Sequence, residues 1–515
     1  MSPGSTAVSP LADQAARDLA VSEFVVPVAL EAGAGTGKTR SLVARLATWL
    51  LGPGWAAAAV ELEERRRSSG VSANVSAEPE EIAARVAEGT VAITFTDAAA
   101  AEMSRRLGEL LGDLSSGTPA KDLAPLPPLL AEVDLVERAQ RLASVLSRLR
   151  LQTIHSFCHR LLADHPFEAG LHPVLSVDAD GTQVAQAATE VLLERLRTRQ
   201  PQIAALIAEG VDPAALHAGL VKLLGSGARK EDFSSARFDD ATCAAILENV
   251  AEPLGRFLPE LARLAATATR VTTLPPALEA LLVLERLLSG GRRDRAGLEA
   301  LCDAARSSSP PWEKLFARYA KEGVGKTEAG ILGAGSAAYL ASANAVGERL
   351  GEILALDPQK FELARQALGP LVEAVRVRLQ RAGVLSFEDL LDRATELVQR
   401  SGPVRRRLRR EIRQLLVDEF QDTDRRQCEL LAALALGDDE GPRPGLFVVG
   451  DPKQSIYAWR NADLASYERF LARMQEAGGK SARLSVNFRS VPAVLAEVER
   501  AIAPVMQHRP GVQPR

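Results

Sequence analysis

Short apolar runs followed by helix-like stretches recur in the first and last parts of the chain. Amphipathic stretches at 97–111 and 155–162 each follow such a run, and Asp97 is placed to cap the first of them. Buried strands that alternate with helices are typical of a parallel sheet covered on both faces, so the pattern predicts a doubly wound α/β domain. The strand candidates are residues 24–30, 91–96, 151–154, 415–417 and 446–449.

The middle of the chain, from 167 to 383, has a different pattern. Apolar residues there repeat at helical spacing, and Ser and Pro gather at 307–311, where we expect a loop. We therefore expect an all-helical domain inserted in the sheet domain, whose two parts are residues 1–166 and 384–486. One predicted helix carries the apolar stripe Phe361, Ala364, Leu368, Leu371, Val375 and Leu379.

Composition places the chain among ordinary globular proteins. It has 515 residues, 46% of them hydrophobic, so it can form about three domains with normal cores. We expect a cytoplasmic protein without a membrane partner, because the N-terminus lacks a signal-peptide pattern and no 18 apolar residues run together. The four cysteines lie far apart, which does not suggest zinc or an iron–sulfur cluster. With a net charge of −4, any binding of nucleic acid must depend on a local groove.

A phosphate-binding pattern follows the first strand candidate. Small residues there allow backbone N–H groups to surround phosphates at a helix N-terminus. Lys38 can neutralise the terminal phosphates, and the Thr39 hydroxyl can bind Mg²⁺. Ala32 occupies the first position, where Gly is more usual. The pattern consists of Ala32, Gly33, Ala34, Gly35, Thr36, Gly37, Lys38 and Thr39.

Residues 320–327 match the same pattern, ending in Gly325, Lys326 and Thr327. Their context differs, because a charged, helix-like stretch at 312–319 precedes them where a strand is needed. We therefore interpret this second match as coincidental.

Two adjacent carboxylates end the strand candidate at 415–417. Asp418 can hold Mg²⁺ and Glu419 can polarise an attacking water, because phosphoryl transfer depends mainly on positioning and charge neutralisation. The alternative is an acidic turn that caps the helix beginning near Arg425. Lys38 and Asp418 are 380 residues apart, which again indicates a large insertion between the two sites.

The run Gly450 to Arg460 follows the strand candidate at 446–449. Gln454 and Arg460 can sense a phosphate, and the faces of Tyr457 and Trp459 can stack on unpaired bases. We interpret the run as a coupling loop at the carboxyl end of a strand, where α/β sheets bind ligands. The alternative is a turn with incidental aromatic residues.

Taken in order, these segments resemble the UvrD/Rep class of superfamily-one DNA helicases, and most of all the RecB and AddA recombination motors. The resemblance adds Gln14 as an adenine-reading residue, Arg40 as a residue near the nucleotide, and Phe488 and Arg489 as contacts to adenine and the γ-phosphate. It assigns contacts with single-stranded DNA to Phe95, Thr96 and His155. The motifs that carry it are 94–103, 153–158, 385–391, 418–423, 450–460 and 487–490.

The resemblance implies a RecA-like P-loop sheet domain, with ATP and Mg²⁺ bound and with 3′–5′ movement on DNA in repair and recombination. Partners would be single-stranded or duplex-end DNA and a nuclease or second helicase subunit. Motors of this class have two RecA-like lobes, but only 25 residues follow Ser490, so we expect 487–515 to begin a second lobe that is otherwise missing. The alternative is a nucleotide- and DNA-binding module without motor activity.

Overall fold

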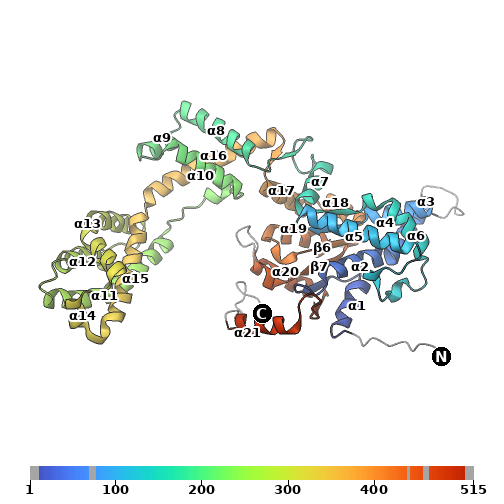
Figure 1. Ribbon diagram of the computed structural model, residues 1–515. Coiled ribbons are helices and arrows are strands. Elements are labelled where there is room, and N and C mark those ends of the chain that lie inside the picture. The colour runs from blue at the N-terminus through green and yellow to red at the C-terminus, as the bar shows by residue number, and fades with distance from the viewer. Residues whose placement is uncertain (1–10, 69–76, 438–440, 456–462, 505–515) are drawn as a thin grey trace. The chain divides into compact units, whose positions relative to one another are not determined.

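The computed structural model describes residues 11–68, 77–437, 441–455 and 463–504. The chain forms two compact units, one of residues 1–179 with 380–515 and the other of residues 180–379 (Figure 1). The second unit interrupts the first in sequence, as expected, although we predicted its limits as 167 and 383. The difference arises because the chain pairs with itself at the junction, where β4 (Ser176–Val177) lies parallel to β5 (Val384–Leu385).

The first unit contains a six-stranded, all-parallel sheet in the order β3-β2-β6-β7-β1-β8. Its strands are β1 (Val28–Ala32), β2 (Thr90–Thr94), β3 (Arg150–Thr153), β6 (Gln414–Val417), β7 (Gly445–Gly450) and β8 (Lys480–Leu484). The edge strand β8 was not predicted, because its residues are mostly exposed and give no apolar run. The predicted strand at 24–30 begins later, at Val28, directly after Pro27.

The inner strands β1, β2, β6 and β7 are buried on both faces of the sheet, which explains why they read as apolar runs. In β1, Val28 and Leu30 face one core, whereas Ala29 faces the other. The first core is completed by α1 (Gln14–Ser22), α2 (Lys38–Leu51), α3 (Pro53–Ser68), α4 (Pro79–Glu88), α5 (Asp97–Ser115) and α6 (Leu135–Ser144). The second is completed by α7 (Ile154–Asp164), α17 (Phe387–Arg400), α18 (Gly402–Glu411), α19 (Arg425–Ala435) and α20 (Leu464–Glu476).

The last helix of the first unit, α21 (Pro492–Ile502), has no buried residue. It lies within residues 487–515, where we expected the start of a second lobe. Among the described residues, no helix of either unit is long and apolar enough to cross a membrane.

The second unit is helical throughout its described regular structure. Four of its helices share one apolar core that includes Trp312 and Tyr319: α11 (Asp240–Thr267), α12 (Leu274–Gly290), α13 (Arg295–Glu322) and α15 (Ser336–Ala355). The loop expected at 307–311 was wrong: α13 continues through Pro310 and Pro311, because buried residues on both sides of the prolines keep it packed. The helices are α8 (Thr182–Arg197), α9 (Pro201–Ala208), α10 (Pro213–Gly225), α11 (Asp240–Thr267), α12 (Leu274–Gly290), α13 (Arg295–Glu322), α14 (Lys326–Leu332), α15 (Ser336–Ala355) and α16 (Pro358–Arg381).

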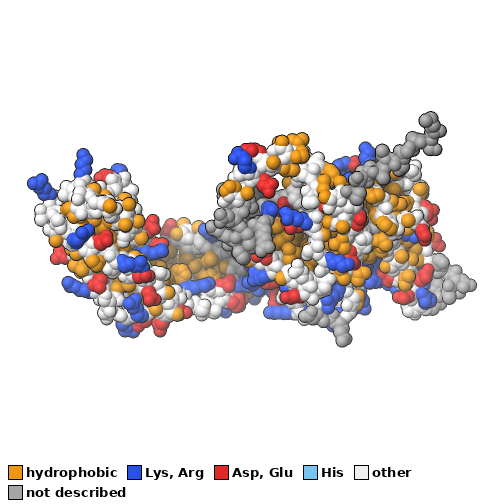
Figure 2. Space-filling view, turned by 90° about the horizontal axis from the view of Figure 1, so that it is seen from below, with side chains coloured by type: hydrophobic (Ala, Val, Ile, Leu, Met, Phe, Trp, Pro, Cys, Tyr) orange, Lys and Arg blue, Asp and Glu red, His pale blue; other side chains and the backbone are white. Residues whose placement is uncertain are grey.

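Charged side chains of both signs are interspersed on the face of the molecule seen in Figure 2. This distribution agrees with the small net charge of −4. Any recognition of an anion must therefore come from particular side chains held in place by the fold.

Candidate nucleotide site

The phosphate loop connects β1 to α2. Gly35 and Gly37 have φ angles of +76° and +92°, a left-handed conformation that residues with a Cβ rarely adopt. The Thr36 hydroxyl donates a hydrogen bond to the Gly33 carbonyl at 2.7 Å, which closes the turn. Gly37 precedes α2 and has no side chain that could cap it, so the first N–H groups of the helix are available to an anion.

Lys38, the first residue of α2, contacts the acidic motif. Its Nζ lies 2.5 Å from Oε2 of Glu419, and only 11% of the lysine side chain is exposed. Glu419 follows β6 with a φ of +49°, an uncommon conformation for a residue with a side chain. Residues 381 positions apart are thus brought together at the carboxyl end of the sheet. This contact is the central feature of the site.

Asp418 lies beside this pair at the end of β6. Burial raises its pKa to about 6, the nearby Glu419 carboxylate adds to the shift, and Lys38 opposes it. A half-buried carboxylate that is costly to ionise suits a position where a cation would compensate its charge. The residues therefore fit a nucleotide with Mg²⁺, which Thr39 and Asp418 would hold, while Lys38 and the loop would face the phosphates.

Gln421 links the acidic motif to the coupling loop, a role that the sequence analysis did not assign. Its buried amide nitrogen donates to Glu419 at 2.8 Å and to Asp422 at 3.1 Å, and its oxygen accepts the backbone N–H of Asp451 at 2.9 Å. Gln454 in turn donates to the Asp451 carboxylate at 2.7 Å. The start of the coupling loop is therefore joined to the carboxylates of the acidic motif by side-chain hydrogen bonds. Tyr457, Trp459 and Arg460 lie outside the described residues.

Asp422 is the least satisfied polar group of the site. Burial raises its pKa to about 6, helped by the charge of Glu419. Its Oδ1 atom is buried, and among the described residues it has no hydrogen-bond partner. Such an atom is unusual in a folded protein and is consistent with a site that a ligand or water completes.

The segment after β8 packs directly on the phosphate loop. The side-chain amide of Asn487 donates to the Ala34 carbonyl at 2.7 Å, and the backbone N–H of Phe488 donates to the Gly35 carbonyl at 2.8 Å. A Cβ at Gly35 would lie only 2.6 Å from the Cβ of Arg489, so only glycine fits there. Phe488 and Arg489 are thus both at the loop, with the Phe488 residue 59% exposed.

Helix α1 lies beside this segment. The amide of Gln14 donates to Asp18 at 2.8 Å, on the surface of the helix. One turn further on, Arg17 donates to the carbonyl of Thr36 in the phosphate loop at 3.1 Å. Neither Arg17 nor its partner Asp13 was singled out from the sequence.

Arg40 points away from the loop. Its guanidinium donates to the carbonyls of Lys121 at 2.7 Å and Ala124 at 2.9 Å. Although Arg40 is only two residues after Lys38, its described contacts are with the 121–124 segment. Its expected role near the nucleotide stays a prediction.

The residues expected to contact DNA follow β2 and β3, which are neighbours in the sheet. Thr96 caps α5 by accepting the N–H of Ala99 at 3.1 Å, so the expectation that Asp97 caps this helix was wrong. Phe95 is half-buried. The His155 ring packs edge-on against Phe387 with 4.8 Å between centroids, and burial lowers its pKa. All three residues lie at the same end of the sheet as Asp418.

The second phosphate-loop pattern lies between two helices of the other unit, α13 and α14. The fully buried carboxylate of Glu328 accepts the N–H of Gly325 at 2.6 Å. It also receives hydrogen bonds from Arg318 at 2.5 Å and Tyr319 at 3.0 Å. Lys326 is exposed. A carboxylate of the chain itself therefore occupies the place where a phosphate would bind.

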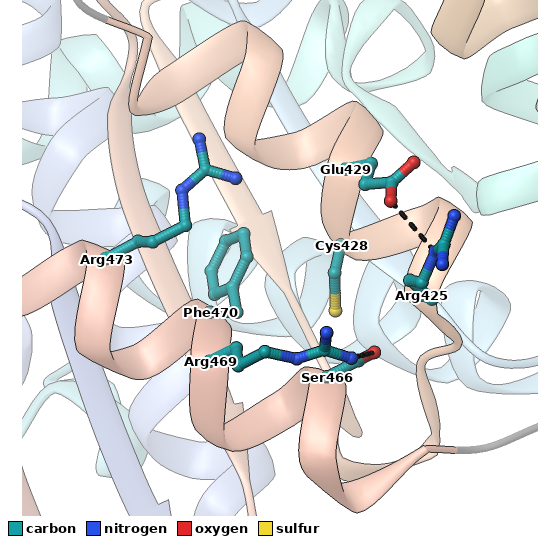
Figure 3. Close-up of a pocket in the computed structure, with 7 residues that line it drawn as sticks. All are labelled: Arg425, Cys428, Glu429, Ser466, Arg469, Phe470 and Arg473. Atoms are coloured by element: carbon teal, nitrogen blue, oxygen red, sulfur yellow. Dashed lines mark hydrogen bonds and ion pairs between the residues drawn. The ribbon is translucent and has the colours of Figure 1, made fainter.

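A separate pocket of about 300 Å³ lies between α19 and α20 (Figure 3). Among the described residues, none of the side chains predicted for nucleotide or DNA binding lines it. Arg425 in its wall is paired with Glu429 at 3.0 Å, and Cys428 and Phe470 are buried. We therefore do not assign this pocket to the nucleotide site. Its lining residues are Arg425, Cys428, Glu429, Ser466, Arg469, Phe470 and Arg473.

Several known proteins are similar to this chain in sequence. One subunit of the ATP-dependent helicase/nuclease of Pelotomaculum thermopropionicum is 28% identical over 472 residues, covering 80% of this chain and 34% of the relative. RecBCD enzyme subunit RecB of Mycolicibacterium smegmatis is 33% identical over 144 residues, or 28% of this chain and 12% of the relative. DNA helicase II of Haemophilus influenzae is 34% identical over 123 residues, or 24% of this chain and 16% of the relative.

The chain spans about a third of the length of the helicase/nuclease relatives, 34% of one and 36% of another. The family model described as the UvrD/REP helicase N-terminal domain matches residues 13–475, which include the phosphate loop, the acidic motif and the helical unit between them. The chain therefore belongs to the UvrD/REP helicase family.

Proposed function

We propose that this chain is the ATP-hydrolysing, DNA-contacting part of a 3′–5′ DNA helicase that acts in repair and recombination. The observation that carries the proposal is the contact of Lys38 with Glu419 beside Asp418. A cation for phosphates, a carboxylate for water and a carboxylate for Mg²⁺ are the groups that nucleotide hydrolysis requires. When bound, Mg²⁺ would neutralise charge on the phosphates.

The geometry suggests how hydrolysis would be controlled. The Nζ atom of Lys38 lies 2.5 Å from Oε2 of Glu419. When Lys38 turns to a phosphate, Glu419 loses this partner and can accept a hydrogen bond from water. Gln421, which also contacts Glu419, would pass the change to Asp451 and the coupling loop.

The DNA would lie along the carboxyl end of the sheet. Phe95, Thr96 and His155 follow β2 and β3, next to β6 in the strand order. A half-buried Phe95 and a His155 whose pKa is lowered by burial offer uncharged surfaces suited to bases more than to phosphates.

The test is ATP hydrolysis by the chain with and without single-stranded DNA. We expect DNA to stimulate hydrolysis, and Lys38→Ala to remove both the basal and the stimulated rate. If the wild-type chain neither binds nor hydrolyses ATP, the proposal is wrong.

The second candidate function is a binding module without motor activity. It is considered because the match covers only 34% and 36% of two helicase/nuclease relatives. Displacement of streptavidin from either end of biotinylated single-stranded DNA separates the two. Release from the 5′ end alone indicates 3′–5′ movement, whereas ATP and DNA binding without release favours the module.

Two of the relatives are named as subunits of larger enzymes, a helicase/nuclease and RecBCD. We propose that this chain likewise works beside a nuclease or a second helicase subunit. A protein with nuclease motifs, encoded by a neighbouring gene, that forms a stable complex with the purified chain would support this arrangement. Unwinding of DNA by this chain alone would contradict it.

A further inference from the structure

Arg17 on α1 is held in one orientation. Its Nε and Nη2 atoms donate to the two carboxylate oxygens of Asp13, at 2.8 and 2.9 Å. Only 15% of the Arg17 side chain and 2% of the Asp13 side chain are exposed. A bidentate pair of this kind fixes the plane of the guanidinium as well as its position.

From this fixed position, Arg17 contacts two parts of the nucleotide site. Its Nη2 donates to the carbonyl of Thr36 at 3.1 Å, within the phosphate loop. Its Cζ lies 5.1 Å from the centroid of the Phe488 ring, within the range of a cation–π contact. The same guanidinium therefore connects the loop to the aromatic ring beside it.

Asp13 fixes the backbone that leads to this ring. Its Oδ2 atom accepts the N–H groups of Ser485 and Val486, both at 2.9 Å. Burial alone would raise the pKa of Asp13, but the hydrogen bonds from Arg17 and from these two N–H groups together lower it. Asp13 is thus ionised at neutral pH and holds the segment from which Phe488 projects.

We propose that Arg17 is a positioning residue for base recognition, which fixes the Phe488 ring relative to the phosphate loop so that the two receive a purine and its phosphates together. The inference rests on the proposed function, because it requires a nucleotide at this loop. The Phe488 residue is 59% exposed, so surface remains on which a base can stack. A purine would gain more than a pyrimidine, since it offers the larger stacking surface.

The chain offers a matched control. Lys480 on β8 pairs with Glu23, just after α1, at 2.6 Å. Like the contacts of Asp13 and Arg17, this ion pair joins the α1 region to the β8 region. It contacts neither the phosphate loop nor Phe488. Lys480→Ala therefore reports what a general loosening of α1 against β8 does to binding.

The experiment measures binding of ADP, CDP and inorganic tripolyphosphate to the full chain by calorimetry. For Arg17→Ala we expect ADP affinity to fall about two- to fivefold, with a smaller fall for CDP and little change for tripolyphosphate. Lys480→Ala should change none of the three. Equal losses for ADP and tripolyphosphate, or no loss at all, would overturn the inference.

Two further variants test positioning directly. Arg17→Lys keeps the charge but cannot make the bidentate contact, so it should also lose the preference for ADP over CDP. Full recovery in this variant would contradict a positioning role. In a Phe488→Ala background, Arg17→Ala should have no additional effect on the ratio of ADP to tripolyphosphate affinity, whereas an additive loss would argue against the inference.

The same measurements separate this inference from the proposed function. If the wild-type chain binds neither ADP nor tripolyphosphate, or if Lys38→Ala binds them equally well, the proposed function fails. If binding depends on Lys38 but not on Arg17, only the role of Arg17 fails.

Discussion

Two stretches of this chain match the same phosphate-loop pattern, and they differ in everything around it. At 32–39 a strand leads into the loop, and Lys38 meets a carboxylate 381 positions away. At 320–327 a helix leads in, Lys326 is exposed, and Glu328 bonds the loop only three residues from Gly325. The pattern shows which residues can surround a phosphate. The sheet determines whether a carboxylate from a distant part of the chain lies beside them.

The origin of the carboxylate is the instructive difference. Glu328 accepts the N–H of Gly325, so a carboxylate of the chain already takes a backbone donor that an anion would need. Glu419 instead contacts Lys38 alone among the residues of the first loop's pattern, and leaves the backbone N–H groups of α2 to a ligand. A loop whose N–H groups are paired within the chain stabilises the fold. A loop with unpaired N–H groups can bind an anion.

Removing each of the two lysines should give the largest contrast. Lys38→Ala removes the cation that would face the phosphates, so kcat/KM for ATP should fall more than about 10³-fold. Lys326→Ala should leave hydrolysis unchanged. Steady-state ATPase assays of both variants check this, and any comparable loss in Lys326→Ala would assign function to the second loop.

The two glutamates should differ next. Glu419→Gln keeps the shape of the side chain but removes the base, so turnover should fall about 10²–10⁴-fold while ADP affinity is retained. Glu328→Gln should hydrolyse ATP at the wild-type rate. The comparison is refuted if Glu419→Gln loses ADP affinity to the same degree as Lys38→Ala.

The pH dependence of nucleotide binding should report on Asp418 in the first site. Because the pKa of Asp418 is raised to about 6, protonation should reduce Mg²⁺-dependent nucleotide affinity about tenfold between pH 7 and pH 5. For folding of the chain alone the sign is opposite, since this shift stabilises the chain below about pH 4, an effect lost as the pH rises through 6. Calorimetric titrations with and without Mg²⁺ test the first statement.

The pH experiment has an internal control. Asp422 also has a pKa of about 6, so its protonation could produce a similar profile. Asp422→Asn should keep the inflection of Mg²⁺-dependent binding near pH 6. A profile that becomes flat in this variant would transfer the effect from Asp418 to Asp422.

The smallest expected effect concerns stability. Glu328→Ala leaves Arg318, Tyr319 and the N–H of Gly325 without their shared acceptor, which should lower the free energy of unfolding by about 1–3 kcal/mol. Urea denaturation measures this, with Glu322→Ala at a neighbouring exposed position as the control. Nucleotide binding should be unaffected, and a loss of binding would mean that the second loop contributes to the site.

The sequence predicted the sheet wherever its strands are buried on both faces. It did not predict β8, because an exposed edge strand has no apolar run, and it placed a loop at 307–311 inside α13. In that helix, burial of Leu315 and Phe316 after the prolines outweighs the lost backbone hydrogen bonds. Tertiary packing, which short sequence windows do not contain, determined both outcomes.

Local sequence patterns identified Lys38, Asp418 and Glu419 as candidate site residues. They did not predict the hydrogen bonds that connect the site to other segments. The hydrogen bonds of Gln421 to Glu419 and to Asp451 depend on how β6 and β7 align in the sheet. Arg17 was missed for the same reason, since its contacts are 19 residues away at Thr36 and more than 450 residues away at Phe488. Arg40 follows the pattern's last residue, yet contacts with Lys121 and Ala124 determine its orientation.

The strand order has a consequence for folding during translation. β1 lies between β7 and β8, whose residues are synthesised more than 400 positions later, which corresponds to roughly 20–80 s of translation. During that interval the helices of 180–379, whose contacts are local, can already pack, whereas the first strand waits with both edges open. Because the contacts of these helices are local, pulse-labelled hydrogen exchange during refolding of the full chain should also protect Leu254 and Leu301 before Leu30. The nascent segment that will carry the phosphate loop is therefore open to mispairing on both strand edges until its neighbours emerge.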